Sequence, residues 1–178
     1  MRVIGGTFGG RRLETPSDYS VRPTTDKVKE ALFSSIQFEI EGSVVLDLFS
    51  GSGQLGIEAL SRGAEKAVFV DKSAQSVELT KRNLEKCGVE ALVVKGDSIA
   101  FLENCNEYFD IAFLDPPYSV GLLEQALPAV SRRMNKSGVI IAECPAGDEL
   151  PEEIESGFRL AKQKKYGKLR LNYYRYGK

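Results

Sequence analysis

Four consecutive residues past the middle of the chain, Asp115-Pro116-Pro117-Tyr118, combine groups that suit a flat ligand bearing an amino group. They follow the apolar run 109–114, which is typical of a buried strand. Two prolines fix the backbone and remove two amide donors, so the local polar groups that remain are acceptors. A carboxylate and a proline carbonyl can hold an exocyclic amino group while the tyrosine ring stacks on a planar base. The alternative is a rigid strand-to-helix turn with an exposed tyrosine.

A second stretch, residues 44–56, predicts a buried strand, a turn containing Gly51 and Gly53, and the start of a helix. Glycine permits positive φ and leaves room for a ligand to touch the backbone. Asp47 adds a carboxylate beside this turn, which opposes a pyrophosphate but suits a ligand that is positively charged near the glycines. S-adenosylmethionine carries an ammonium and a sulfonium there. The alternative is an acidic residue in solvent within an ordinary nucleotide-binding domain.

Two further acidic residues follow predicted strands. Asp71 ends the run 67–70, at roughly the 20-residue spacing from the glycines at which a carboxylate binds both ribose hydroxyls of an adenosine. It could instead begin a helix. Asp97 follows the run 91–94 and could accept a hydrogen bond from an adenine amino group, but Asp97 or Ser98 could equally cap the next short helix.

The composition excludes several classes of chemistry. The chain of 178 residues contains no histidine and three cysteines, and it has no C-x-x-C motif. We therefore expect no metal site and no Ser-His or Cys-His nucleophile, and the cysteines fit a reducing compartment. We find no signal-peptide core and no apolar run of transmembrane length, so we expect a cytoplasmic protein without membrane contact.

Basic residues gather at both ends of the chain. Residues 1–12 contain Arg2, Arg11 and Arg12 and no acidic residue, and residues 159–178 contain eight Lys or Arg and no acidic residue, although the whole chain has a net charge of −1. Basic ends on an acidic body favour a polyanionic partner. Solvated strand faces would explain the same pattern.

The order of the elements predicts an α/β fold. Strand and helix signals alternate to about residue 143, and an antiparallel hairpin follows around Tyr166-Gly167-Lys168. This order predicts a seven-stranded, mostly parallel Rossmann-like sheet with helices on both faces. Residues 1–42 form an extension in this interpretation: a hairpin pairing 2–4 with 11–13, then a helix with Val28, Ala31, Leu32 and Ile36 on one face. Residues 43–178 form the main domain.

The chain resembles the RsmD family of bacterial 16S ribosomal RNA guanine-N2 methyltransferases. The resemblance rests on five segments in the family's order, and it runs nearly end to end. They are residues 2–6 with Gly10-Arg11, Arg22-Pro23-Thr24-Thr25-Asp26-Lys27, Leu46 to Gly53, Leu114 to Tyr118, and Tyr166-Gly167. The chain departs from many relatives at Lys168, so the role of this hairpin is open.

The resemblance implies a role for each candidate residue. S-adenosylmethionine would be the methyl donor: Gly51 and Gly53 would approach its methionine part, Asp47 would lie near its ammonium, Asp71 would hold the ribose, and Asp97 with Ser98 would face the adenine. Asp115 and the Pro116 carbonyl, in the turn shared with Pro117, would orient the guanine N2 amino group, and Tyr118 would stack on the base. With RNA as the polyanionic partner that the basic ends of the chain favour, we expect RNA contacts from Arg2, Arg11, Arg12, Arg22, Lys168 and Arg170. The partner would be 16S rRNA or the small subunit, and we expect a monomer.

Other functions stay open on the sequence alone. A DNA adenine-N6 methyltransferase can carry the same Asp-Pro-Pro-Tyr motif, although we find no segment for a domain that reads DNA sequence. A nicotinamide-dependent oxidoreductase is disfavoured by Asp47 and by the absence of an evident hydride-transfer residue. A non-catalytic RNA-binding module is disfavoured by the intact site motifs.

Overall fold

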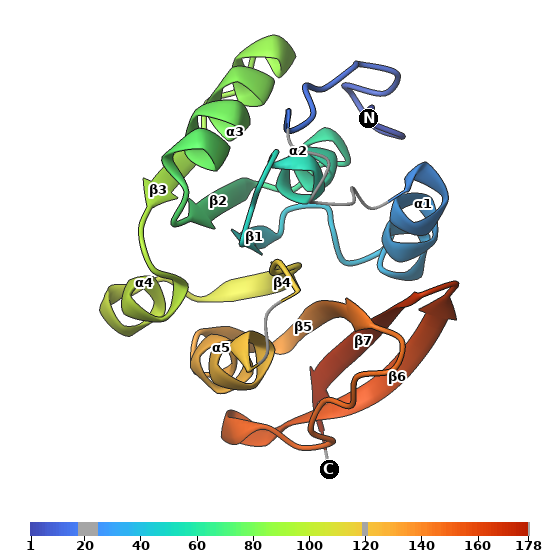
Figure 1. Cartoon of the computed structure of the whole chain (residues 1–178), viewed down its shortest axis with the longest axis vertical. Helices are drawn as coiled ribbons and strands as arrows, with labels where there is room; N and C mark the ends of the chain where they lie inside the picture. The colour runs from blue at the N-terminus through green and yellow to red at the C-terminus, as the bar shows by residue number, and fades with distance from the viewer. Residues whose placement is uncertain (18–24, 119–120, 178) are drawn as a thin grey trace.

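The computed structural model of the chain describes residues 1–17, 25–118 and 121–177. Its elements alternate between helix and strand as far as β5 and then end in two strands (Figure 1). In chain order they are α1 (Asp26–Ser35), β1 (Val44–Leu48), α2 (Gln54–Ser61), β2 (Lys66–Asp71), α3 (Ala74–Cys87), β3 (Leu92–Lys95), α4 (Ser98–Asn104), β4 (Phe109–Leu114), α5 (Leu122–Ser131), β5 (Met134–Pro145), a single 3₁₀ turn (Glu155–Gly157), β6 (Phe158–Tyr166) and β7 (Leu169–Tyr176).

The strands form one seven-stranded sheet in the order β3-β2-β1-β4-β5-β7-β6. Strands β1 to β5 are parallel, whereas β7 pairs antiparallel with both β5 and β6. From β1 the chain adds β2 and β3 on one side and then adds β4 and β5 on the other, so the topological switch point lies between β1 and β4. In open parallel sheets, ligands bind beyond the carboxyl ends of the strands at this point. The predicted fold class is confirmed.

Helices cover both faces of the sheet, with α1, α2 and α3 on one side and α4 and α5 on the other (Figure 1). Each buried strand alternates its side chains between the two layers: Val45, Phe113 and Ile141 pack with α1 to α3, while Leu46, Leu114 and Ala142 pack with α4 and α5. This alternation fixes which side chains face which layer at the carboxyl ends of the strands.

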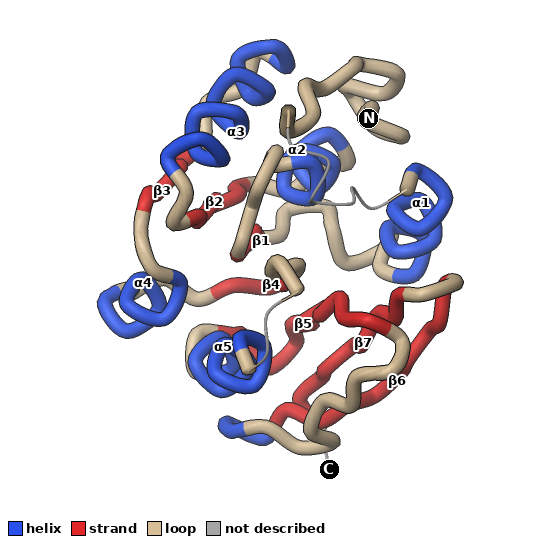
Figure 2. Tube along the Cα trace, viewed as in Figure 1, coloured by secondary structure: helices blue, strands red, loops and turns tan. Residues whose placement is uncertain are grey.

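The N-terminal segment forms a short hairpin beside α2 and α3, as Figure 2 shows in tan. Its pairing is a single antiparallel bridge between Arg2 and Arg12, with Val3 N–H donating to Arg11 O at 2.9 Å. The carboxylate of Glu58 on α2 holds this hairpin, because it accepts the backbone N–H groups of Ile4 and Gly5 at 2.9 Å each. The hairpin is thereby attached to the helix that begins at the glycine turn.

The predicted inner face of helix α1 is largely confirmed: Val28, Leu32 and, just past the helix, Ile36 are buried, and Ala31 is half-buried. Thr25 caps the helix, and Lys29 and Phe33 are buried in addition. Lys29 is fully buried because its ammonium lies 3.5 Å from Glu58, which is also fully buried. Burial lowers the pKa of Lys29, and Glu58 opposes that shift. The apolar pattern did not predict the burial of Lys29, because its partner Glu58 lies on another helix.

Candidate active site

The turn between β1 and α2, residues 49–53, is the glycine loop of the predicted site. Gly51 and Gly53 both have positive φ, +55° and +78°. A Cβ on Gly51 would meet nothing within 4 Å, whereas a Cβ on Gly53 would lie 2.9 Å from the methyl group of Thr80. Gly51 is therefore needed for backbone conformation and open space above the loop, and Gly53 for close packing of the loop on α3.

Asp47 lies beneath the glycine loop and is only 2% exposed. Its Oδ2 accepts the N–H of Gly56, in the first turn of α2, at 2.9 Å. The pKa of Asp47 is raised to about 8, chiefly by burial; the hydrogen bond from Gly56 opposes this shift, and the charge of Asp71 adds to it. The side chain of Asp47 thus accepts a backbone N–H in the first turn of α2, a group that a pyrophosphate-binding helix would donate to its ligand.

Asp71 connects the glycine loop to the start of α3. Its Oδ2 accepts the N–H of Gly51 at 3.0 Å, and its Oδ1 accepts the N–H of Ser73, the cap of α3, at 2.9 Å. The side chain stays half-exposed at the carboxyl end of β2. Each oxygen retains a lone pair, so the carboxylate can accept further hydrogen bonds from a ligand's hydroxyl groups.

Asp97 is the cap of α4, and this is the alternative that the sequence left open. Its side chain accepts the N–H of Ala100 at 2.9 Å. Asp97 is exposed at the carboxyl edge after β3, while Ser98 is buried as the first residue of the helix. Capping uses one lone pair of the Asp97 carboxylate, which leaves it able to accept from a ligand.

The Asp-Pro-Pro-Tyr turn, residues 115–118, follows β4 at the same edge of the sheet. Asp115 is half-buried, Pro116 is buried, and Tyr118 is 62% exposed. Pro116, Pro117 and Tyr118 line a cavity of about 470 Å³ whose other walls come from the start of α5 and from residues 143–150. This volume lies within the range of small-molecule sites, about 300–1,000 Å³.

Three residues of this region were missed by the sequence analysis. Glu143, in β5, is buried and lines the cavity. Thr80 Oγ1 donates to Gly51 O at 2.9 Å, and the Asn83 amide donates to Ser52 O at 2.9 Å, both from the inward face of α3. An acidic residue directly after the apolar run 139–142, and polar residues on an otherwise apolar helix face, were the available signals.

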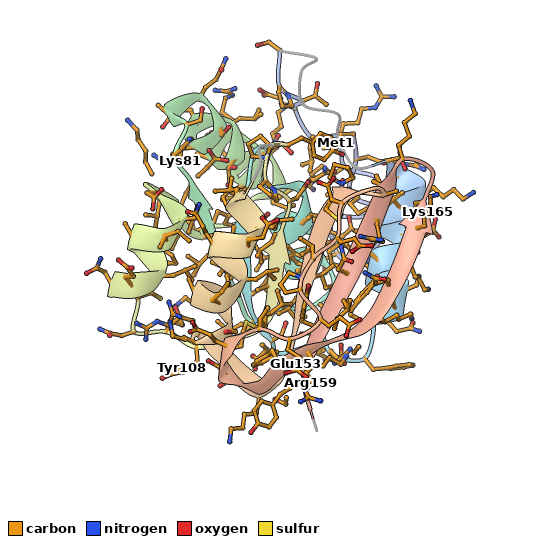
Figure 3. The ribbon with its side chains drawn as sticks, turned by 60° about the horizontal axis from the view of Figure 1, so that its bottom comes forward. Met1, Lys81, Tyr108, Glu153, Arg159 and Lys165 are labelled. Atoms are coloured by element: carbon orange, nitrogen blue, oxygen red, sulfur yellow. The ribbon has the colours of Figure 1, made fainter. Side chains whose placement is uncertain are left out.

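The basic C-terminal hairpin is divided between two opposite ends of the molecule. Lys165 lies at the same end as Met1 in Figure 3, whereas Arg159 lies at the other end, beside Glu153. The turn carrying Lys168 joins the carboxyl end of β5, because Ala146 N–H donates to Lys168 O at 2.8 Å. Lys165 and Lys168 are exposed there. Arg170 differs, since its Nε and Nη2 are buried without a hydrogen-bond partner and cannot meet RNA without moving.

The predicted N-terminal RNA contacts also differ in their surroundings. Arg2 pairs with Asp26 at 3.1 Å, and Arg12 is exposed. Arg11 donates to Lys86 O at 2.8 Å, so it reaches the last turn of α3. Arg22 lies outside the described residues.

A second cavity, of about 270 Å³, lies at the amino edge of the sheet and includes Glu39, Asp110 and Ser137, none of them a predicted site residue. Within the described ranges, no three His, Cys, Asp or Glu side chains are grouped as metal ligands. Among the helices that the structure describes, none has the length and apolar character needed to cross a bilayer.

Comparison with known proteins places this geometry in a family. The family model described as Conserved hypothetical protein 95 matches residues 1–175. The chain is similar to Ribosomal RNA small subunit methyltransferase D of Escherichia coli K12, with 33% identity over 98% of this chain and 89% of that protein. Its counterpart of the same name in Haemophilus influenzae is 42% identical over 71% of this chain and 68% of that protein.

Solved structures agree in fold with the chain. The structure of yhhF from Escherichia coli has a TM-score of 0.88 and 31% identity, and the match covers 99% of both chains. A hypothetical protein from Thermus thermophilus has a TM-score of 0.84 and 29% identity, covering 97% of this chain and 98% of that one. The chain belongs to the small-subunit ribosomal RNA methyltransferase D (RsmD) family.

Proposed function

We propose that this protein transfers a methyl group from S-adenosylmethionine to the exocyclic N2 amino group of a guanine in 16S ribosomal RNA. The observation that supports this best is the Asp-Pro-Pro-Tyr turn. Its last three residues, Pro116, Pro117 and Tyr118, line a cavity of about 470 Å³. The turn follows β4, which is paired with β1, the strand that leads into the glycine loop, so both lie at the carboxyl edge of the sheet. The family relatives named for small-subunit rRNA methylation support the RNA substrate.

The glycine loop and its neighbours fit the methyl donor. Gly51 leaves open space above the loop, and Asp71 and Asp97 present carboxylates at the ends of β2 and β3. Asp47 and Asp71 already accept the N–H groups of Gly56 and Gly51, which weakens the loop as a pyrophosphate site and disfavours a nicotinamide dinucleotide. When bound, S-adenosylmethionine supplies an electrophilic methyl group on a sulfonium.

The Asp-Pro-Pro-Tyr turn would orient the base and receive its proton. The guanine N2 lone pair is delocalised into the ring, so acceptors that hold both amino hydrogens favour the nitrogen geometry in which positive charge develops. Asp115 and the Pro116 carbonyl would be these acceptors. As the N–C bond forms and the C–S bond breaks, the sulfur keeps the bonding electrons, and Asp115 would take the N2 proton directly or through water.

Tyr118 would hold the extruded base by stacking. Its exposed ring forms part of the cavity wall. Stacking of a base on an aromatic side chain contributes about 1–3 kcal/mol, which offsets part of the cost of removing a guanine from its own stack.

The decisive experiment uses small subunits and naked 16S rRNA from a bacterial strain that lacks its RsmD enzyme. Both are incubated with the protein and methyl-labelled S-adenosylmethionine, and the RNA is digested to nucleosides. We expect label in N2-methylguanosine. Label in N6-methyladenosine, or no transfer to either substrate despite donor binding, would overturn the proposal.

A further inference from the structure

We propose that Glu143 is a specificity-determining residue that recognises the N1–H and N2–H edge of the target guanine. The inference rests on the proposed function and assigns one group that would select guanine over other purines. It is carried by the position of Glu143, which is 5% exposed and lines the same cavity as Pro116 and Tyr118.

The sheet register places Glu143 beside the Asp-Pro-Pro-Tyr turn. Leu114 is paired with Ala142, so the next positions of the two parallel strands are Asp115 and Glu143. Side chains alternate along a strand, and Phe113 and Ile141 pack together on the α1 side of the sheet. Glu143 therefore lies on the α1 side of β5, and Asp115 directly follows the neighbouring strand β4 at the same edge of the sheet.

The charge of the cavity wall favours a base over a phosphate. Four of the residues that line the cavity are acidic, Glu124, Glu143, Asp148 and Glu149, and its described lining contains no lysine or arginine. A phosphate would be repelled by these carboxylates, whereas a group that presents hydrogen-bond donors would be attracted. Of the four, Glu143 is the buried one, and Glu149 and Asp148 are exposed.

Guanine presents the complement of a carboxylate. Its N1–H and one N2–H are parallel donors, and a carboxylate has two acceptor oxygens that can take both. Adenine and 2-aminopurine have an N1 lone pair in place of the N1–H, which would face a negative oxygen. A buried polar group left without its partner rejects such an analogue strongly, so Glu143 would favour guanine. Glu143 would share one N2–H with the Pro116 carbonyl and leave the other for Asp115.

The test changes the target base in the RNA and the side chain at position 143 in the protein. The guanosine methylated by the wild type is replaced with 2-aminopurine ribonucleoside in 16S rRNA by splinted ligation, and kcat/KM is measured for both RNAs. We expect the wild type to favour guanosine by about 100-fold or more. Glu143→Gln can donate to the N1 lone pair of 2-aminopurine, so its preference should fall to within about tenfold while S-adenosylmethionine affinity stays at the wild-type value.

Two variants control for folding and general charge effects. Glu143→Asp keeps the carboxylate and should keep the preference at a lower rate, so it also tests the proposal where Glu143→Gln fails to fold. Glu152→Gln, an exposed change outside the cavity, should match the wild type. An unchanged preference in Glu143→Gln, or a lost one in Glu143→Asp, would overturn the assignment of Glu143 alone. N6-methyladenosine as the wild-type product would overturn the proposed function and this inference together.

Discussion

The side-chain amide of Asn83, in α3, donates a hydrogen bond of 2.9 Å to the carbonyl oxygen of Ser52 in the glycine loop. The same amide nitrogen donates to Glu14 O at 3.1 Å, and the amide oxygen accepts Glu14 N–H at 2.7 Å. Asn83 is fully buried. One side chain thus connects the N-terminal segment to the loop on which the methyl donor would lie.

The first prediction is that Asn83→Ala loosens both segments at once. The change leaves the buried Ser52 O and the partly buried N–H and O of Glu14 without their partner, at about 1–3 kcal/mol for each group that stays unsatisfied. We expect a loss of unfolding free energy on the order of 2–4 kcal/mol in chemical denaturation, and weaker S-adenosylmethionine binding by calorimetry. Asn104→Ala, which removes an exposed Asn that bonds within α4, is the matched control and should change neither. Wild-type donor affinity in Asn83→Ala would show that this connection does not support the loop.

The second prediction concerns pH and the buried carboxyl of Asp47. Its pKa is raised to about 8, whereas an aspartate in the unfolded chain titrates near 3.9. Between these values the folded state binds the proton more tightly, so Asp47 makes the free energy of unfolding fall as pH rises, until the folded-state pKa is passed. Asp47→Asn keeps an acceptor for Gly56 N–H but cannot titrate.

Chemical denaturation at pH 6, 7 and 8 measures this difference. From pH 6 to pH 8 the wild type should lose stability relative to Asp47→Asn by an amount on the order of 2 kcal/mol, since each pH unit inside the window corresponds to about 1.4 kcal/mol. Parallel stability curves for the two proteins would show that the Asp47 carboxyl is ionised in the folded protein throughout this range.

The third prediction separates the two ends of the basic hairpin. Lys165 and Lys168 lie at the end that carries the candidate site, so their replacement by glutamine should weaken RNA binding and lower the slope of log affinity against log salt by about two. Filter binding of 16S rRNA at several salt concentrations measures both quantities.

The matched control removes two charges at the opposite end. Arg159 pairs with Glu153 at 2.9 Å, and Lys136 lies over the ring of Tyr176, a residue paired in the sheet with Phe158 at the start of β6. The double change Lys136→Gln and Arg159→Gln should leave the salt slope unchanged. Equal effects of the two double variants would indicate nonspecific attraction rather than an RNA contact near the site.

Much of the fold could be predicted because the sheet is buried on both faces. Mostly apolar stretches mark such strands, and residues 109–114, predicted as a strand, have the same bounds as β4 although Asp110 interrupts the apolar pattern. The apolar run 139–142 marks only the central part of β5, which spans Met134–Pro145, because the first residues of this strand are largely exposed and polar. The order of the acidic residues after strands predicted which side chains would meet at one edge.

What the sequence could not supply were contacts made across elements. Asp47 Oδ2 accepts the N–H of Gly56, nine residues later, under the loop, and the sequence did not indicate this contact. The expected place of Asp47 near the ligand's ammonium stays a prediction. Lys29 and Asn83 are polar residues on buried helix faces, and their partners Glu58 and Ser52 belong to another helix and a loop. The periodicity of apolar residues predicts which face of a helix is buried. It does not predict the burial of a polar residue whose partner comes from elsewhere in the chain.

The last prediction separates chemistry from base binding within the Asp-Pro-Pro-Tyr turn. Asp115→Asn keeps the shape of the side chain but removes the proton acceptor and the charge that favours a developing positive nitrogen. We expect kcat to fall by about 10²–10⁴-fold with S-adenosylmethionine affinity unchanged, measured by single-turnover methyl transfer and by calorimetry. Near-normal turnover in this variant would remove Asp115 from the catalytic role.

Tyr118 should act through its ring and not through its hydroxyl group. Tyr118→Ala should weaken productive RNA binding by about 5–150-fold, which corresponds to a stacking contribution of about 1–3 kcal/mol, while Tyr118→Phe should stay within a few-fold of the wild type. Tyr108 is comparably exposed, at 53% against 62%, but lies at the end of the molecule away from Met1 (Figure 3), so Tyr108→Ala is the matched control. A large defect in Tyr118→Phe would transfer the role to the hydroxyl group. Equal defects in Tyr118→Ala and Tyr108→Ala would mean that loss of an exposed ring, wherever it lies, accounts for the effect.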